Sequence, residues 1–167
     1  GAAILAAYGA LRAGAGLVSI YTEKESRPLV HSALPEIMTL DLDSLVEKWR
    51  KRKSSELKKV LETFSVLCIG PGFGKSARSL HVLHSFLENF KGPVVADADA
   101  LNLTSLNPEI AKHFSRNCVL TPHPGEAARL LGVTTKEIEA DRIRAVSKLQ
   151  KKFLSTIVLK GASCLVA

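Results

Sequence analysis

The sequence VLTPHPGE, residues 119–126, decides the fold because it joins a strand signal to a helix signal. Residues 118–120 form a short apolar run that favours a strand, and Pro122 removes a backbone donor where that strand ends. Pro124 suits the first turn of a helix, and Gly132 is placed to terminate that helix. The stretch therefore predicts a strand that leads through a loop into a helix.

Strand and helix signals alternate through residues 65–160, which argues for parallel βαβ units. Residues 23–34 read as a polar connection, and 42–61 as one helix or two with a break at 50–55. Strands are predicted at 17–21, 37–40, 65–69, 93–96, 118–120, 156–160 and 163–166, the last two forming a hairpin, and helices at 2–13, 75–89, 108–114, 124–131 and 134–152.

Three loops with distinctive residues follow successive predicted strands. They are GPGFG at 70–74, DADALN at 97–102 and TPHPGE at 121–126. Because the carboxyl ends of parallel strands meet at one edge of a sheet, these loops are expected to cluster on one rim, where such sheets bind ligands. His123 lies on that rim, so its imidazole is a candidate ligand contact rather than a packing residue.

Each rim loop has a chemical interpretation and a plain structural one. The glycines of 70–74 expose amides that suit an anion or a closely approaching sugar, although a tight strand-to-helix turn needs them equally. Asp97 and Asp99 suit Mg²⁺ or a ligand hydroxyl, or cap the next helix. Lys160 suits a phosphate and Gly161 an approaching adenine or ribose, whereas the plain alternative is a hairpin with a solvent-exposed lysine.

Composition indicates one soluble domain. The 167 residues are 46% hydrophobic and only 5% aromatic, which is enough for one core built on aliphatic side chains. No membrane span or signal peptide is predicted, because no apolar run is long enough and no charged region precedes the alanine-rich start. Cys68, Cys118 and Cys164 each lie in an apolar run without metal-ligand spacing, so they are expected to be buried thiols in a reducing compartment.

The net charge of +7 is concentrated in one segment. Residues 47–59 hold seven basic residues against two glutamates, a pattern typical of a solvated helix face. The alternative is a non-catalytic module that binds nucleic acid or an acidic partner. The segment has no interleaved aromatics, and Trp49 fits the apolar side of its helix, so binding to nucleic acid is not expected.

The order of the motifs is more specific than any one of them. Along the chain they are Gly-Ala-Ala at 1–3 with ALRAGAGLV at 10–18, LPEIM at 34–38, GPGFG at 70–74, DADALN at 97–102, TPHPGE at 121–126 and VLKGA at 158–162. In this order the motifs closely resemble those of the ADP/ATP-dependent NAD(P)H-hydrate dehydratases, over essentially the whole length of the chain. The resemblance implies an α/β, ribokinase-like fold, in which a central, mostly parallel sheet is flanked by helices in three layers.

The resemblance also implies a hydro-lyase that dehydrates the S form of hydrated NADH or NADPH, with ADP or ATP as co-substrate and Mg²⁺ as cofactor. Hydroxide is a poor leaving group, and transfer of a phosphoryl group to the hydroxyl makes it a good one. The rival interpretation is a ribokinase-like kinase of a small alcohol, such as a vitamin precursor. The loops at 97–102 and 121–126 together favour the dehydratase.

The family pattern implies roles for individual residues. Ala2 or Ala3, Gly72 and His123 are expected to contact the hydrated nicotinamide nucleotide. Cys164 stands where the family commonly has threonine, which affects a side-chain contact but not a backbone contact. The adenine nucleotide is expected to contact Lys160, Gly161, Ala162, Ser163 and Cys164.

The family's catalytic aspartate, in a Gly-Thr-Gly-Asp segment, is expected after Ala167, and its first strand before Gly1. Residues 1–167 are therefore interpreted as a single ribokinase-like domain that is incomplete at both ends, and this polypeptide alone is expected to lack dehydratase activity. The resemblance further implies a homo-oligomer, a tetramer, in the cytoplasm, or in mitochondria if a longer parent carries a transit peptide.

Overall fold

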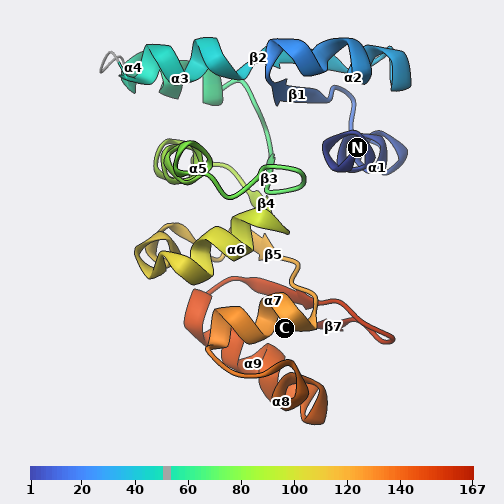
Figure 1. Cartoon of the computed structure of the whole chain (residues 1–167), viewed down its shortest axis with the longest axis vertical. Coiled ribbons are helices and arrows are strands. Elements are labelled where there is room, and N and C mark those ends of the chain that lie inside the picture. Colours follow the sequence, from blue (N-terminus) through green and yellow to red (C-terminus); the bar gives the residue numbers. More distant parts are fainter. Residues whose placement is uncertain (51–53) are drawn as a thin grey trace. The chain divides into compact units, whose positions relative to one another are not determined.

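The computed structural model describes residues 1–50 and 54–167, with side chains outside 48–57. The chain divides into two compact units, Gly1–Leu61 and Glu62–Ala167, which are described one at a time (Figure 1). The single-domain assignment of residues 1–167 stays a prediction. The expected packing of Trp49 and most of the basic run lie outside the described residues.

The first unit is built around two parallel strands whose register runs from Ser19 opposite Met38 to Thr22 opposite Asp41. Both ends of the segment 42–61 are helical, and the predicted break at 50–55 falls largely on residues 51–53, which lie outside the described part of the chain. The elements are α1 (Ala2–Arg12), β1 (Ser19–Thr22), the 3₁₀ turn η1 (Lys24–Ser26), α2 (Arg27–Ala33), β2 (Met38–Asp41), α3 (Leu42–Arg50) and α4 (Ser54–Leu61).

Helix α1 packs on this unit through Ala3, Ile4, Ala7 and Leu11, against a buried cluster that includes Ile20, Val30 and Ile37. The helical periodicity predicts one apolar stripe of Ile4, Leu5, Tyr8 and Leu11. Ile4 and Leu11 confirm it, whereas Leu5 and Tyr8 are 72% and 46% exposed, so that part of the prediction was wrong. Alanine on the packed face lets the helix axis approach the strands more closely than leucine and tyrosine would allow.

The second unit contains a five-stranded sheet in the order β3-β4-β5-β6-β7. The first four strands pair in parallel, and β7 is antiparallel to β6, so both the βαβ units and the terminal hairpin are confirmed. The strands are β3 (Leu67–Ile69), β4 (Val94–Ala96), β5 (Cys118–Leu120), β6 (Thr156–Leu159) and β7 (Leu165–Val166).

The two faces of this sheet differ in burial. The row formed by Ile69, Ala96, Leu120 and Ile157 is at most 5% exposed. The adjacent row, on the opposite face, is half-buried or exposed and consists of Cys68, Val95, Val119 and Thr156. The prediction of buried thiols therefore holds for Cys118 but was wrong for Cys68, which lies on the more open face, and for Cys164, which precedes β7 and is exposed.

The connecting helices follow the predicted order with two corrections. The segment 97–102, expected as a loop, already forms the start of a helix from Asp99 onward. The helix expected around 108–114 is a 3₁₀ helix. The elements are α5 (Ala77–Asn89), α6 (Asp99–Leu106), η2 (Pro108–His113), α7 (Pro124–Leu131), α8 (Thr135–Ala140) and α9 (Arg142–Phe153).

The continuous helix predicted at 134–152 was also wrong, because the chain breaks at Asp141. The Asp141 backbone leaves the helical region, with φ −150° and ψ 79°, and its carboxylate accepts from the Arg144 amide at 2.9 Å. A short acidic side chain that captures a backbone amide competes with helix continuation and starts a new helix instead. Among the described residues, no helix is both long and apolar enough to cross a membrane.

Gly70 marks the closest approach between two parallel strand ends. It follows β3 with φ 118°, and a Cβ there would collide with the Asp97 carbonyl oxygen and lie 2.9 Å from the Ala100 Cβ. Glycine at this position therefore lets the loop at 70–74 lie directly against the start of α6.

We expect Gly70→Ala to lower the free energy of unfolding by about 3 kcal/mol or more, because the collision is with backbone and the backbone conformation is unfavourable for alanine. The matched control is Gly132→Ala, where φ is 68° but nothing lies within 4 Å of the added Cβ. Its expected cost is about 1 kcal/mol. Urea unfolding of both variants measures the difference, and equal losses would contradict the close-approach argument.

Candidate functional site

The rim loops are held together by the backbone. The Asp97 amide donates to the Ile69 carbonyl at 3.1 Å, Thr121 to Ala96 at 3.1 Å, and Lys160 to Pro122 at 2.9 Å. Each bond extends the parallel ladder past the end of a strand. The predicted clustering of the three loops on one edge is therefore confirmed, and the start of the hairpin joins them.

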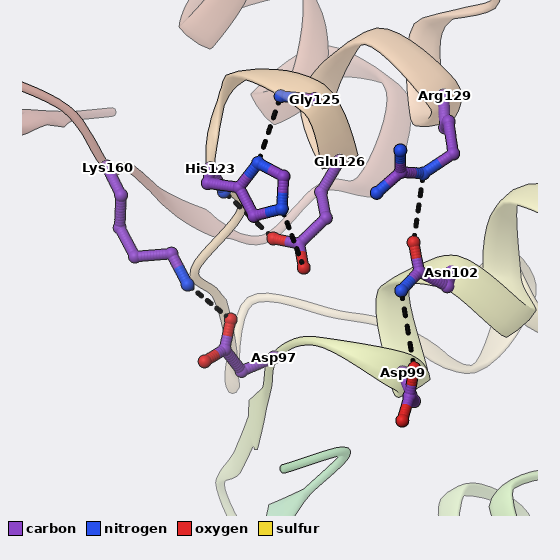
Figure 2. A network of polar contacts seen from close by, with 8 residues as sticks. All are labelled: Asp97, Asp99, Asn102, His123, Gly125, Glu126, Arg129 and Lys160. Atoms are coloured by element: carbon purple, nitrogen blue, oxygen red, sulfur yellow. Dashed lines mark hydrogen bonds and ion pairs between the residues drawn. The ribbon is translucent and has the colours of Figure 1, made fainter. Parts of the chain in front are cut away.

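Asp97 and Lys160 form an ion pair across this rim, with Nζ and Oδ1 2.7 Å apart and side chains 29% and 38% exposed (Figure 2). Burial alone would raise the pKa of the Asp97 carboxyl, but hydrogen bonds from Lys160 and Thr121 and the lysine charge outweigh it. The pKa of Asp97 therefore lies below its ordinary value. Lys160 is therefore partly exposed, as the plain alternative expected, but it is paired with a carboxylate.

Asp99 belongs to a second chain of polar contacts. Its Oδ2 accepts from the Gly74 amide at 2.9 Å, and its Oδ1 accepts from the Asn102 side chain at 3.4 Å. The Asn102 Oδ1 in turn accepts from Arg129 Nε at 2.9 Å, as Figure 2 shows. The sequence did not indicate a role for Arg129, which lies on α7, because it meets Asn102, 27 positions away, only in the folded chain.

Neither aspartate caps α6 through its side chain; the N-cap residue is Ala98, with φ 50° and ψ −116°. Such a backbone costs energy for alanine and persists because the surrounding contacts hold it. This strained turn directs Asp97 and Asp99, on either side of it, to different partners.

His123 occupies the N-cap of α7. Its Nδ1 accepts from the Gly125 amide at 3.0 Å, while Glu126 accepts from the His123 amide at 2.9 Å, which completes a capping box. The Glu126 side chain is 5% exposed and that of His123 51% exposed. Because Nδ1 accepts, a neutral His123 carries its proton on Nε2, and this atom lies 3.4 Å from Glu126 Oε1, as Figure 2 shows.

The remaining predicted site residues fall into three places. Gly72 lies in the glycine turn with φ 69°. Gly161, Ala162, Ser163 and Cys164 form the turn of the β6-β7 hairpin, where Arg142 donates to three of its carbonyls. Ala2 and Ala3 open α1 in the first unit, and Ala3 packs against that unit's core.

The part of the chain that the structure describes holds no group of three or more histidine, cysteine or acidic side chains able to bind a metal. Asp97 is paired with Lys160, and both oxygens of Asp99 accept hydrogen bonds. The carboxylates proposed as weak metal candidates are thus engaged by protein donors and do not fit a preformed Mg²⁺ site. Two hollows of about 270 Å³ lie away from the rim, one at the amino ends of β4 and β5 and one among α7, α8 and α9.

The ion pair predicts a pH dependence of stability. A carboxyl with a lowered folded-state pKa contributes stability above its unfolded pKa of about 3.9, and that contribution is lost as the pH falls through the folded value. We expect Asp97→Asn to cost about 1 kcal/mol or less at pH 7, since the pair is partly solvent-screened, and to cost less toward pH 3. Urea unfolding across this range measures it. In a Lys160→Met background the difference should shrink, and an unchanged difference would contradict the pairing.

Comparison with known proteins identifies the family to which the chain is similar. The family model for NAD(P)H-hydrate dehydratase matches residues 1–167. The bifunctional NAD(P)H-hydrate repair enzyme Nnr of Escherichia coli (strain K12) is 44% identical over 160 residues, which are 95% of this chain and 28% of that protein. The ADP-dependent (S)-NAD(P)H-hydrate dehydratase of Neisseria meningitidis serogroup B is 38% identical over 172 residues, covering 100% of this chain and 53% of that one.

Solved structures give the same result. A ribokinase-like superfamily protein of Enterococcus faecalis superposes with a TM-score of 0.80 at 27% identity, covering 99% of this chain and 54% of that one. The ADP/ATP-dependent NAD(P)H-hydrate dehydratase of Bacillus subtilis, co-crystallised with ATP and Mg²⁺, gives 0.74 at 27% identity, with coverages of 99% and 55%. The chain therefore spans about half the length of these solved proteins.

These similarities confirm the ribokinase-like fold that the motifs implied. On the match of the family model to its whole length, the chain belongs to the NAD(P)H-hydrate dehydratase family.

Proposed function

We propose that the protein carrying this chain restores NADH or NADPH from the S form of the hydrate, in a reaction that consumes ADP or ATP. One observation supports the proposal. Lys160, the glycine turn and the half-exposed His123 all lie at one edge of the second unit's sheet. A cation, backbone amides and a neutral imidazole donor suit a phosphorylated nucleotide and a polar substrate.

The chemistry needs a better leaving group than hydroxide. The hydroxyl oxygen of the hydrate attacks the terminal phosphorus of the nucleotide. The phosphoryl group moves to that oxygen, and the nucleotide leaves with one phosphate fewer. Loss of a ring proton then accompanies cleavage of the carbon–oxygen bond, so that inorganic phosphate departs and the double bond is restored. We assign the catalytic base to no residue of this chain.

Within this scheme the rim residues bind and orient. The Lys160 ammonium neutralises phosphate charge once the phosphate shares it with Asp97 or displaces that carboxylate. The Nε2 donor of His123 holds an oxygen of the nicotinamide nucleotide once that oxygen replaces Glu126 as its neighbour. Gly72 admits the substrate close to the backbone. Mg²⁺ would enter with the nucleotide phosphates, since it is usually bound through phosphates, waters and one or two carboxylates.

Two further assignments extend the proposal. Family resemblance supports a homo-tetramer, which light scattering of the purified protein tests. The three cysteines are unpaired, which fits the cytoplasm or another reducing compartment. Fluorescent tagging in cells tests that location.

The activity is tested by following recovery of NADH absorbance when hydrated NADH is mixed with Mg²⁺ and either ADP or ATP. We expect recovery with at least one nucleotide from the full protein that carries this chain. Absence of recovery from a folded protein with both nucleotides would contradict the proposal, and phosphorylation of a small alcohol without NADH recovery would favour the kinase.

The role of His123 is tested by a pair of helix caps. His123→Ala and Thr134→Ala each remove a side-chain cap and one half of a capping box, so each should cost about 1 kcal/mol of stability. Only His123→Ala should also lower kcat/KM for the hydrate, by about tenfold for one lost substrate hydrogen bond. Equal kinetics in the two variants would reduce His123 to a structural cap.

A further inference from the structure

The turn of the β6-β7 hairpin is organised by one arginine. Nη2 of Arg142 donates to the carbonyl oxygens of Ser163 at 2.8 Å, Lys160 at 3.1 Å and Leu159 at 3.4 Å. The Arg142 side chain is only 18% exposed. The guanidinium therefore bonds to both sides of the turn and holds the backbone of the turn in place.

The helix break at Asp141 explains how Arg142 reaches the hairpin. Arg142 is the first residue of α9, a helix that packs against both β6 and β7. The sequence did not indicate this role, because the periodicity predicted one helix through this position.

Gly161 is shaped by the same arginine. A Cβ on Gly161 would lie 2.5 Å from Nη2 and 2.8 Å from both Cζ and Nη1 of Arg142. The guanidinium therefore occupies the space that any larger residue at 161 would fill. This is a different reason for glycine than the close approach of a ligand.

The carbonyl contacts also determine where the neighbouring amides point. In a planar trans peptide, the N–H is directed opposite to the C=O. With the Lys160 and Ser163 carbonyls turned toward Arg142, the amides of Gly161 and Cys164 are directed away from it. Two backbone donors are thereby presented by a turn that begins at the rim.

We propose that Arg142 is a positioning residue for adenine-nucleotide binding: it fixes the turn at 160–164 so that the Gly161 and Cys164 amides meet acceptor atoms of the nucleotide. The inference rests on the proposed function of this turn. Arg142 acts through the turn and not by touching phosphate, because its Nη2 is bonded to three carbonyls of the hairpin, its Nε is buried, and little of its side chain is exposed.

The kinetic test uses Arg142→Met and Arg142→Lys in the full protein, with Arg144→Met, an exposed arginine two residues along α9, as the control. Loss of the guanidinium contacts to the turn should raise KM for ADP or ATP about tenfold in both Arg142 variants. The value of kcat and the KM for the hydrate should change less than about twofold. Arg144→Met should leave all three unchanged. Full recovery of the nucleotide KM by lysine would show that charge alone suffices and would overturn the proposal.

The structural test uses Gly161→Ala alone and combined with Arg142→Met. If glycine is required by the guanidinium, the effects on the nucleotide KM should be less than additive, because the collision disappears once Arg142 is shortened and only the strain of alanine at φ 157° remains. Additive effects would assign the need for glycine to its backbone conformation or to ligand approach and would contradict the inference.

Hydrogen exchange of the turn amides provides a readout that does not need turnover. Exchange at residues 160–164 should be about tenfold faster in Arg142→Met than in wild type, with α5 unchanged. Equal exchange would overturn the positioning role even if the variant were inactive. A wild-type protein without nucleotide-dependent turnover would contradict the proposed function and the inference together, whereas an active wild type whose Arg142 variants keep the nucleotide KM contradicts the inference alone.

Discussion

Parallel pairing of β3 to β6 is the constraint on which the second unit depends. It brings the carboxyl ends of four strands to one edge, and its ladder continues past the strands through the amides of Asp97, Thr121 and Lys160. Backbone bonds of this kind leave the loops little freedom, so residues far apart in sequence are fixed relative to one another. Gly70 permits the tightest of these approaches, because no side chain fits between it and Asp97.

The polar side chains of the rim are already bonded to one another. Lys160 is paired with Asp97, and Asp99 joins the glycine turn to Asn102 and Arg129. These contacts satisfy groups that would otherwise be costly to bury in part. In the proposed function, a phosphate would compete with the Asp97 carboxylate for Lys160, so the ion pair would lower nucleotide affinity as well as add stability.

Several residues serve the fold and the proposed chemistry through different atoms. His123 accepts from the helix at Nδ1, and its Nε2, beside Glu126, is the atom proposed to meet a ligand, while the carbonyls of the hairpin turn face Arg142 and the amides face away. A structural role and the proposed functional role of one residue can therefore rest on different atoms. This is why single motifs were ambiguous in the sequence.

The sequence by itself determined the alternation of strands and helices, the hairpin, the start and end of α7 at Pro124 and Gly132, and the order of loops along one edge. Each of these depends on neighbours within a few residues, or on the rule that parallel strands share a carboxyl edge. It misplaced part of the buried face of α1, the start of α6, the break at Asp141 and the exposure of Cys68. The partners of Asp97, Asn102 and Arg142 were decided only by the tertiary structure, since those contacts join residues 63, 27 and up to 21 positions apart, and local patterns carry no information about side chains that meet only after the sheet has formed.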